Sequence, residues 1–348
     1  MTFMIAVWPL VFALGLQSPA WQAAPALPRP VSNNAVVAVS TPSGPAVFSL
    51  MGLDSTVRWD GVVNWAFRWN VGERSWQEIA PVPGPGRLAA TAQAVGGSIY
   101  LFGGYTVAQD GSEQSLPNVD ILDPDTGEWR AGTPMPIPVD DAVSGVWRDS
   151  LIYLVSGWHD QDNVPSVQLY DPATDTWEQA TPIPGRPVFG HAGGIVGNSI
   201  VYVDGVRTHP ARPRFTMEGG AWRGDIDPAD PTSIAWRRIG DHPGPPLYRA
   251  GAVGVDGAVI FAGGTNNPYN YDGIGYNTWP SEPRRAVFRY DPDADRWSGW
   301  GELPRPVMDL RGIVVAGDRL VIVGGMTAAQ WVSDSVWTAE LTGPPTTP

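Results

Sequence analysis

The chain has 348 residues, of which 43% are hydrophobic, and carries a formal net charge of −13. This charge makes binding to a nucleic-acid backbone unlikely because such binding depends on cationic side chains. The absence of cysteine excludes disulfides, thiolate metal sites and cysteine nucleophiles. The length allows one to three domains, and 41 glycines, 36 prolines and 17 tryptophans favour an all-β fold of short strands.

The N-terminus is apolar. Residues Phe3 to Leu16 are almost wholly hydrophobic, and Ser18-Pro19-Ala20 supplies the small residues typical of a cleavage site, although no Lys or Arg precedes the apolar run. We predict a signal peptide over residues 1–20, with a membrane anchor as the alternative, and a Pro-rich lead-in over 21–31. No other segment is long and apolar enough to span a bilayer. The expected location is therefore periplasmic or secreted.

One stretch, 150–186, defines a repeating unit. An alternating apolar run, Leu151 to Val155, ends at Ser156-Gly157, and a second run ends at the Asp171-Pro172 turn before Trp177. Apolar alternation bounded by Gly, Asp-Pro and Pro clusters predicts short antiparallel strands.

Two landmarks recur with this unit. The first is a small-residue pair after the apolar run: Met51-Gly52, Gly103-Gly104, Ser156-Gly157, Asp204-Gly205, Gly263-Gly264 and Gly324-Gly325. The second is a tryptophan further on: Trp76, Trp129, Trp177, Trp236 and Trp297. Successive pairs lie about 50 to 60 residues apart, a spacing typical of propeller blades. We expect the tryptophans to pack in the core, and the small residues to allow close backbone approach.

Six landmarks predict an all-β, six-bladed β-propeller of four-stranded antiparallel blades, because one such sheet cannot cover its own faces. The expected blades are 34–80, 87–132, 139–180, 189–240, 249–299 and 310–341, within a propeller over 32–341 and before a tail over 342–348. The last blade has no strand after 337–341, so a terminal strand should complete the blade at the opposite end of the chain. The sequence leaves open which strand does this.

The landmark pattern resembles the kelch repeat family over nearly all of 32–341. The chain is also similar to the exported kelch family of N-acetylneuraminate epimerases (sialic acid mutarotases). Three features carry this likeness: six blades behind a signal segment, the insert GGTNNPYNYDGIGYNTW and the ending VIVGGM…VSDSVW. This resemblance implies a sugar mutarotase. Kelch propellers share a superfamily with galactose oxidase, but the cross-linked tyrosine of that enzyme needs a cysteine, so we exclude its copper activity.

The inner strands should line a central channel, and polar residues gather where these strands begin. Counting back 13 to 16 positions from each glycine landmark gives a predicted channel mouth of Arg87, Asp140, Asp141, His191, Arg249, Asp309 and Arg311. Function in a propeller usually lies at such a rim. The alternative is structural: the arginines pair with the aspartates across blades, and His191 is a buried histidine bonded to a carbonyl.

The insert Thr265 to Arg285 is the second candidate feature. It combines amide, carboxylate and aromatic side chains, including Asn267, Tyr271 and Asp272, a mixture that suits carbohydrate recognition. Trp158 follows a landmark pair and is a further candidate sugar contact. The alternative is a structured lid whose aromatic residues serve packing alone.

A mutarotase needs a general acid and a general base. We assign these two roles to Asp140, Asp141 or His191. For an acidic sugar, Arg249 or Arg311 would bind the carboxylate, and Arg87 and Asp309 are further candidate contacts. The resemblance implies a glutamate after the blade-four glycine, but this sequence has Val206 there. The resemblance also implies an arginine shortly after, which Arg212 matches approximately.

Two functions stay open at this point. The first is a metal-independent sugar mutarotase or epimerase at the channel mouth that uses no cofactor. The second is a non-catalytic kelch module that binds a protein or glycan through the same rim. Neither involves nucleic acid, nor a membrane beyond the N-terminal signal. A fold alone does not choose between them.

Overall fold

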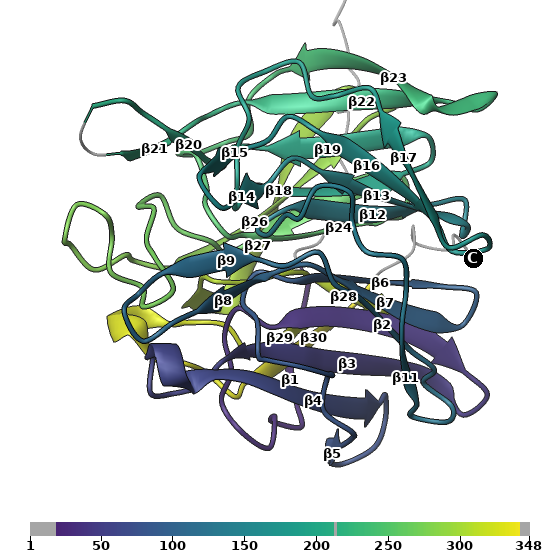
Figure 1. Cartoon of the computed structure of the whole chain (residues 1–348), viewed down its shortest axis with the longest axis vertical. Helices are drawn as coiled ribbons and strands as arrows, with labels where there is room; N and C mark the ends of the chain where they lie inside the picture. The colour runs from purple at the N-terminus through teal and green to yellow at the C-terminus, as the bar shows by residue number, and fades with distance from the viewer. Residues whose placement is uncertain (1–18, 212–213, 342–348) are drawn as a thin grey trace, which may run out of the picture.

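Six four-stranded antiparallel sheets surround a central axis in the computed structural model, which describes residues 19–211 and 214–341 (Figure 1). The predicted six-bladed β-propeller is therefore confirmed. The proposed signal peptide lies almost wholly outside the described residues. Within these residues, no helix is long and apolar enough to cross a membrane.

The first three blades follow one another along the chain, and each begins with its innermost strand. Blade 1 contains β2 (Ala35–Thr41), β3 (Gly44–Leu53), β4 (Val62–Asn70) and β5 (Gln77–Glu78). Blade 2 contains β6 (Thr91–Val95), β7 (Ser98–Phe102), β10 (Val119–Leu122) and β11 (Trp129–Ala131). Blade 3 contains β12 (Val143–Trp147), β13 (Leu151–Val155), β16 (Val167–Asp171) and β17 (Thr176–Ala180).

The last three blades continue this order until the final strand. Blade 4 contains β18 (Ala192–Val196), β19 (Ser199–Val203), β22 (Ala221–Asp227) and β23 (Asp230–Ile239). Blade 5 contains β24 (Gly251–Val255), β25 (Ala258–Ala262), β26 (Arg284–Asp291) and β27 (Arg296–Val307). Blade 6 contains β28 (Val314–Ala316), β29 (Arg319–Val323), β30 (Val336–Glu340) and, as its outermost strand, β1 (Gln22–Ala24).

The N-terminal strand β1 closes the ring. It pairs antiparallel with β30, with Gln22 opposite Thr338 and Ala24 opposite Val336. The closing strand therefore comes from the segment assigned above to the Pro-rich lead-in. The innermost strand of blade 1 is β2, at the start of the segment predicted for that blade.

The landmark tryptophans join neighbouring blades. Tyr170 and Trp177 are paired in register across β16 and β17, and their rings lie 4.8 Å apart. Each landmark indole N–H donates to a backbone carbonyl outside its own blade, at 2.6–3.1 Å: Trp76 to Pro25, Trp129 to Ala80, Trp177 to Thr133, Trp236 to Thr181 and Trp297 to Gly240. The packing role predicted for these residues is confirmed.

The glycine landmarks allow close backbone approach both within a blade and between neighbouring blades. The Gly104 N–H donates to the Val139 carbonyl of the next blade at 3.3 Å, and the Gly264 N–H donates to Val307 at 2.9 Å. A methyl group on Gly104 would lie 2.6 Å from the Leu88 carbonyl oxygen, whereas one on Gly97, which has a similar φ, would meet nothing within 4 Å.

These two glycines therefore form a matched pair of test positions. Gly97→Ala should cost about 1 kcal/mol of unfolding free energy, for its left-handed backbone alone. Gly104→Ala, at φ +86° against +81°, should cost about 1–3 kcal/mol more because the methyl overlaps a fixed carbonyl. Urea denaturation of both variants measures the difference. Equal losses would show that close approach does not explain the glycine pair.

One rim of the propeller, here called the hairpin rim, carries the long excursions. They are the hairpins β8–β9 (Tyr105–Val107, Glu113–Ser115), β14–β15 (Trp158–His159, Asp162–Asn163) and β20–β21 (Val206–Thr208, Phe215–Met217), the loop 265–283, and the 3-10 turns η1 (Trp59–Gly61) and η2 (Ala328–Gln330). Figure 1 shows these excursions toward the left of the molecule. Their apolar side chains pack into one cluster that includes Leu88, Phe189, Tyr248 and Met308.

Candidate functional site

A left-handed residue precedes the innermost strand of every blade. Asn33, Ala89, Asp141, Gly190, Arg249 and Asp309 all have φ between 51° and 62°. This conformation is uncommon for residues other than glycine. The repetition shows that the chain makes the same turn toward the axis six times.

Hydrogen bonds link these turns into a closed ring. Five of these bonds join one backbone N–H to one carbonyl at 2.7–3.2 Å: Asp141 to Ala89, Gly190 to Asp141, Arg249 to Gly190, Leu310 to Arg249 and Asn33 to Asp309. The Ala89 N–H completes the ring by donating to Asn33 Oδ1 at 2.6 Å. All six blades are therefore tied together at the end of the channel.

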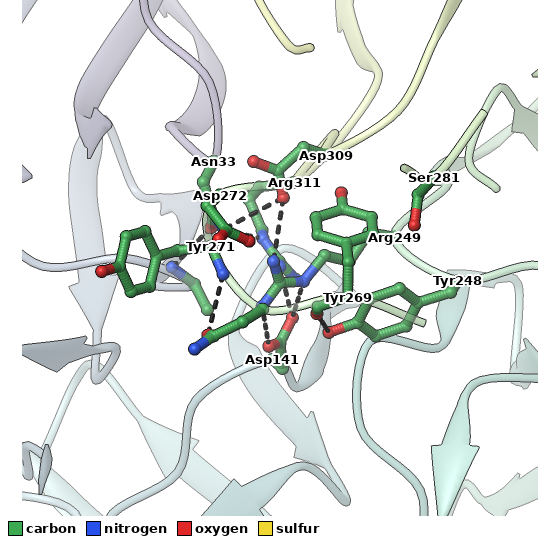
Figure 2. A network of polar contacts seen from close by, with 12 residues as sticks. Asn33, Asp141, Tyr248, Arg249, Tyr269, Tyr271, Asp272, Ser281, Asp309 and Arg311 are labelled. Carbon is green, nitrogen blue, oxygen red and sulfur yellow. Dashed lines mark hydrogen bonds and ion pairs between the residues drawn. The ribbon is translucent and has the colours of Figure 1, made fainter. Parts of the chain in front are cut away.

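Five side chains from this ring and the adjoining strand form what we call the central network: Asn33, Asp141, Arg249, Asp309 and Arg311. Figure 2 shows Arg249 beside both Asp141 and Asp309, with Tyr248 and Tyr269 next to it. The Arg249 guanidinium donates to Asp141 at 2.8 Å and to Asp309 at 3.2 Å, and it lies about 5 Å from the two tyrosine ring centres (4.9 and 5.1 Å).

Arg311 completes the central network. It forms an ion pair with Asp141, and its Nε donates to Asn33 Oδ1 at 2.9 Å. Asn33 in turn donates to Asp309 at 3.0 Å. The network contains two carboxylates and two guanidinium groups, so it is neutral overall, and Asp141 is only 2% exposed. Burial alone would raise the pKa of Asp141, but Arg249 and Arg311 outweigh it and hold that pKa below its usual value.

The central channel lies on one side of this network. It has a volume of about 260 Å³ and is lined by β2, β6, β12, β18, β24, β28 and the residues just before them. Its polar side chains are Thr91, Gln93, Ser144, His191 and Arg311. His191 Nε2 contacts the Val155 carbonyl at 3.0 Å, and burial lowers the pKa of His191 to about 4, so this imidazole is neutral at pH 7.

Asp140 lies on the hairpin rim, in the turn that carries Asp141. It is 2% exposed and accepts a hydrogen bond of 2.6 Å from the Ser115 hydroxyl in β9. Burial and the neighbouring Asp141 carboxylate raise the pKa of Asp140 well above its usual value. Both effects favour the protonated form of the Asp140 carboxyl group.

The β8–β9 hairpin brings three more polar groups toward Asp140. Ser115 and Glu113 lie two residues apart on β9 and so share a face, and Tyr105 lies opposite Ser115 on β8. The buried Tyr105 hydroxyl has no hydrogen-bond partner among the described residues. Glu113 is exposed at the rim, and its pKa is raised, first by the protein atoms that displace part of its solvent and then by Asp141, against the effects of Arg249 and Asn270.

Tyr276, from the loop 265–283, completes this group. Its ring centre lies 4.3 Å from that of Phe215, and its hydroxyl pKa is raised by burial first and then by the charges of Glu113, Asp141 and Asp140. We call Tyr105, Glu113, Asp140 and Tyr276 the rim cluster. It holds two carboxyl groups of raised pKa beside two phenols, and such groups can serve in general acid–base chemistry.

The other predicted site residues lie elsewhere. Arg87 is buried, forms an ion pair with Asp120 of β10 and contacts Met51, so it joins blades 1 and 2. Trp158 packs between Phe189 and Phe215, with ring centres 5.4 and 5.6 Å away.

Residues of the predicted insert mostly organise its own loop. Asn267 bonds Asn277 and the Trp279 carbonyl, and Asp272 caps the Ile274 N–H. Tyr271 packs at the edge of the hairpin-rim apolar cluster. Arg212 lies outside the described residues.

Comparison with known proteins supports the fold. A kelch motif model matches residues 86–136, which contain blade 2. The solved structure of YjhT superimposes with a TM-score of 0.71 at 18% identity, over 90% of this chain and 95% of that one. These six four-stranded blades define the class as a six-bladed β-propeller, and the second blade matches the kelch motif.

Two curated relatives match parts of the chain. The Kelch-like protein terF of Aspergillus terreus is 24% identical over 315 residues, covering 85% of this chain and 62% of that protein. N-acetylneuraminate epimerase of Yersinia enterocolitica is 28% identical over 116 residues, covering 32% of this chain and 26% of that protein. The chain thus spans less than two thirds of the length of either relative.

Proposed function

We propose that this kelch propeller binds a neutral reducing sugar at the rim cluster and catalyses the exchange of its anomers without a metal. The observation that carries the proposal is the placement of two carboxyl groups of raised pKa, Asp140 and Glu113, around Ser115 of the β8–β9 hairpin. The similarity to an epimerase over one third of the chain also favours sugar chemistry.

The chemistry needs two proton transfers. The Glu113 carboxylate removes the proton of the anomeric hydroxyl while the Asp140 carboxylic acid protonates the ring oxygen, and the C1–O bond to the ring breaks. The resulting aldehyde rotates about C1–C2. The ring oxygen then attacks the other face of the carbonyl, and both protons return to their donors, so no net proton is consumed.

A neutral sugar fits better than the acidic one expected from the sequence. Arg249 and Arg311 are both paired with buried aspartates, and Arg87 is paired with Asp120. A sugar carboxylate at the rim cluster would lie near the Glu113 carboxylate without one of these arginines to neutralise it. The phenol ring of Tyr276, which is partly exposed, can contact the C–H face of a sugar, and its hydroxyl group can bond the sugar's oxygens.

Magnetisation-exchange NMR tests the proposal. Neutral and acidic reducing monosaccharides are mixed with the protein, and transfer between α and β anomer signals is measured. We expect faster exchange for at least one neutral sugar. Binding without faster exchange would favour the non-catalytic module, and no response from any sugar would exclude both carbohydrate functions.

Export of the protein is part of the proposal and is supported by the apolar stretch Phe3 to Leu16. N-terminal sequencing of protein recovered from outside the cytoplasm tests it. A mature chain that begins between residues 19 and 22 is expected, and full-length protein confined to the cytoplasm would contradict export.

A further inference from the structure

Exposed large hydrophobic side chains gather on one part of the hairpin rim. Among residues 19–211 and 214–341 they are Ile274, Trp279 and Trp331, and the two tryptophans are 70% and 72% exposed. All three come from the loop 265–283 or from the segment that follows η2. Leaving two indole rings in water forgoes the free energy of burying them, so a bound ligand is the natural explanation for the pair.

The two segments contact each other. The Gln330 side chain donates to the Ser281 carbonyl at 3.2 Å. A methyl group on Gly273 would lie 2.5 Å from the Gln330 side chain and 2.6 Å from Met326, so the segments are closely packed. The two tryptophans therefore belong to segments that contact each other, and both segments lie at the left of the molecule in Figure 1.

The position of Trp279 is fixed by its own loop. Asn277 accepts from the Trp279 N–H at 3.0 Å, and Asn267 donates to the Trp279 carbonyl at 3.2 Å. Asn277 also donates to Asn267 Oδ1 at 2.9 Å. Gly275 leaves room for these bonds, because a methyl group there would overlap Asn267 and Asn277.

Trp331 is held in a similar way. Its carbonyl accepts from both the N–H and the hydroxyl of Thr327, at 2.8 and 3.2 Å, which closes the turn around η2. Both rings are thus presented by ordered backbone. Preorganised aromatic surfaces lose little entropy when a ligand stacks on them.

The chemistry beside the rings indicates the ligand. Exposed amide or hydroxyl groups of Asn266, Asn277 and Thr278 lie in the same loop as Trp279 and can bond sugar hydroxyls. The exposed carboxylates of Glu282 and Asp334 disfavour an acidic polymer. The same loop also supplies Tyr276 to the rim cluster, three residues before Trp279.

We infer that Trp279 and Trp331 are outer subsites for a neutral oligosaccharide whose reducing end occupies the rim cluster. This inference rests on the proposed function. The substrate is then a glycan chain with a free reducing end. The tryptophans bind the sugar units beyond that end by stacking against their C–H faces.

Isothermal titration with cello-, malto- and manno-oligosaccharides of one to six units tests the inference. In the wild type, affinity should rise with chain length in at least one series. Trp279→Ala and Trp331→Ala should each weaken binding of the hexasaccharide about two- to tenfold, with Trp279→Phe restoring part of the loss. Anomer exchange of the monosaccharide should not change in any of these variants.

The outcomes separate the two proposals. If monosaccharide exchange is observed but affinity is independent of chain length, or is unaffected by both alanine variants, the subsites do not exist and the proposed function stands. If no sugar of any length binds or exchanges, both proposals fail. Because both rings are exposed, unchanged thermal unfolding of the variants is the control for folding.

Discussion

Replacing Arg249 with alanine is expected to lower the free energy of unfolding by about 3–5 kcal/mol, because it leaves Asp141 and Asp309 buried without their shared cation. Arg249 lies at the centre of the network, and the pKa of its guanidinium is raised well above the usual value, since the two aspartates and neighbouring tyrosines outweigh the effect of burial. The variant should therefore unfold at much lower urea concentration.

Arg237→Ala is the matched control. Arg237 pairs with Asp295 at 3.2 Å, but both side chains are largely exposed, so this pair should contribute about 0–1 kcal/mol. Denaturation of both variants by urea, followed by tryptophan fluorescence, gives the comparison. A similar, small loss in both would show that the central network does not hold the ring together. Such a result would return Arg249 to the candidates for ligand binding.

The largest expected effect on activity belongs to the rim cluster. Glu113→Gln and Asp140→Asn should each lower the rate constant for anomer exchange by about 10²–10⁴-fold, because each removes one proton-transfer group. Both replacements keep the size of the side chain. Glu128→Gln, in the turn between β10 and β11, is the control, since this exposed carboxylate lies outside the site.

The pH profile should be bell-shaped. Glu113 must be ionised, so the rate falls as the pH drops through its raised pKa. Asp140 must be protonated, so the rate also falls as the pH rises through the raised pKa of Asp140. Glu113→Gln should remove the acidic limb of whatever activity is left and keep the basic one. A profile that keeps both limbs in this variant would assign the base to another residue.

Much of the fold could be predicted from the sequence because each blade repeats the same physical requirements. A small pair such as Gly103-Gly104 marks the close approach of two backbones, and a tryptophan such as Trp177 marks the contact between blades. The closing strand could not be predicted in this way. Its residues, Gln22 to Ala24, carry no landmark and gain their partner only in the assembled ring.

The candidate site could be predicted only in part. Counting back from the glycine landmarks found Asp141, Arg249 and Asp309 because the left-handed turn recurs at nearly the same distance in each of these blades. It missed Asn33 because blade 1 has a longer first hairpin and an irregular register between Leu50 and Gly52. The spacing of the landmarks does not determine that Arg249 and Arg311 form ion pairs with buried aspartates.

Other residues escaped the periodic pattern for a different reason. Glu113 and Tyr105 belong to a hairpin that the regular blade lacks, so no landmark spacing points to them. Their role depends on the face they share with Ser115, which contacts Asp140. Arg87, in contrast, fits the spacing but turns between two blades toward Asp120.

The pairing of β1 with β30 also determines the order in which the molecule can be assembled. Blades 1 to 5 are each contiguous in the chain, so each can form as it leaves the ribosome. Blade 6 needs both β1 and β30, so it is completed only after the strands of the five other blades have been synthesised. Until then β1 must stay unpaired and available. The blade that is completed last therefore contains the strand that is synthesised earliest among those described.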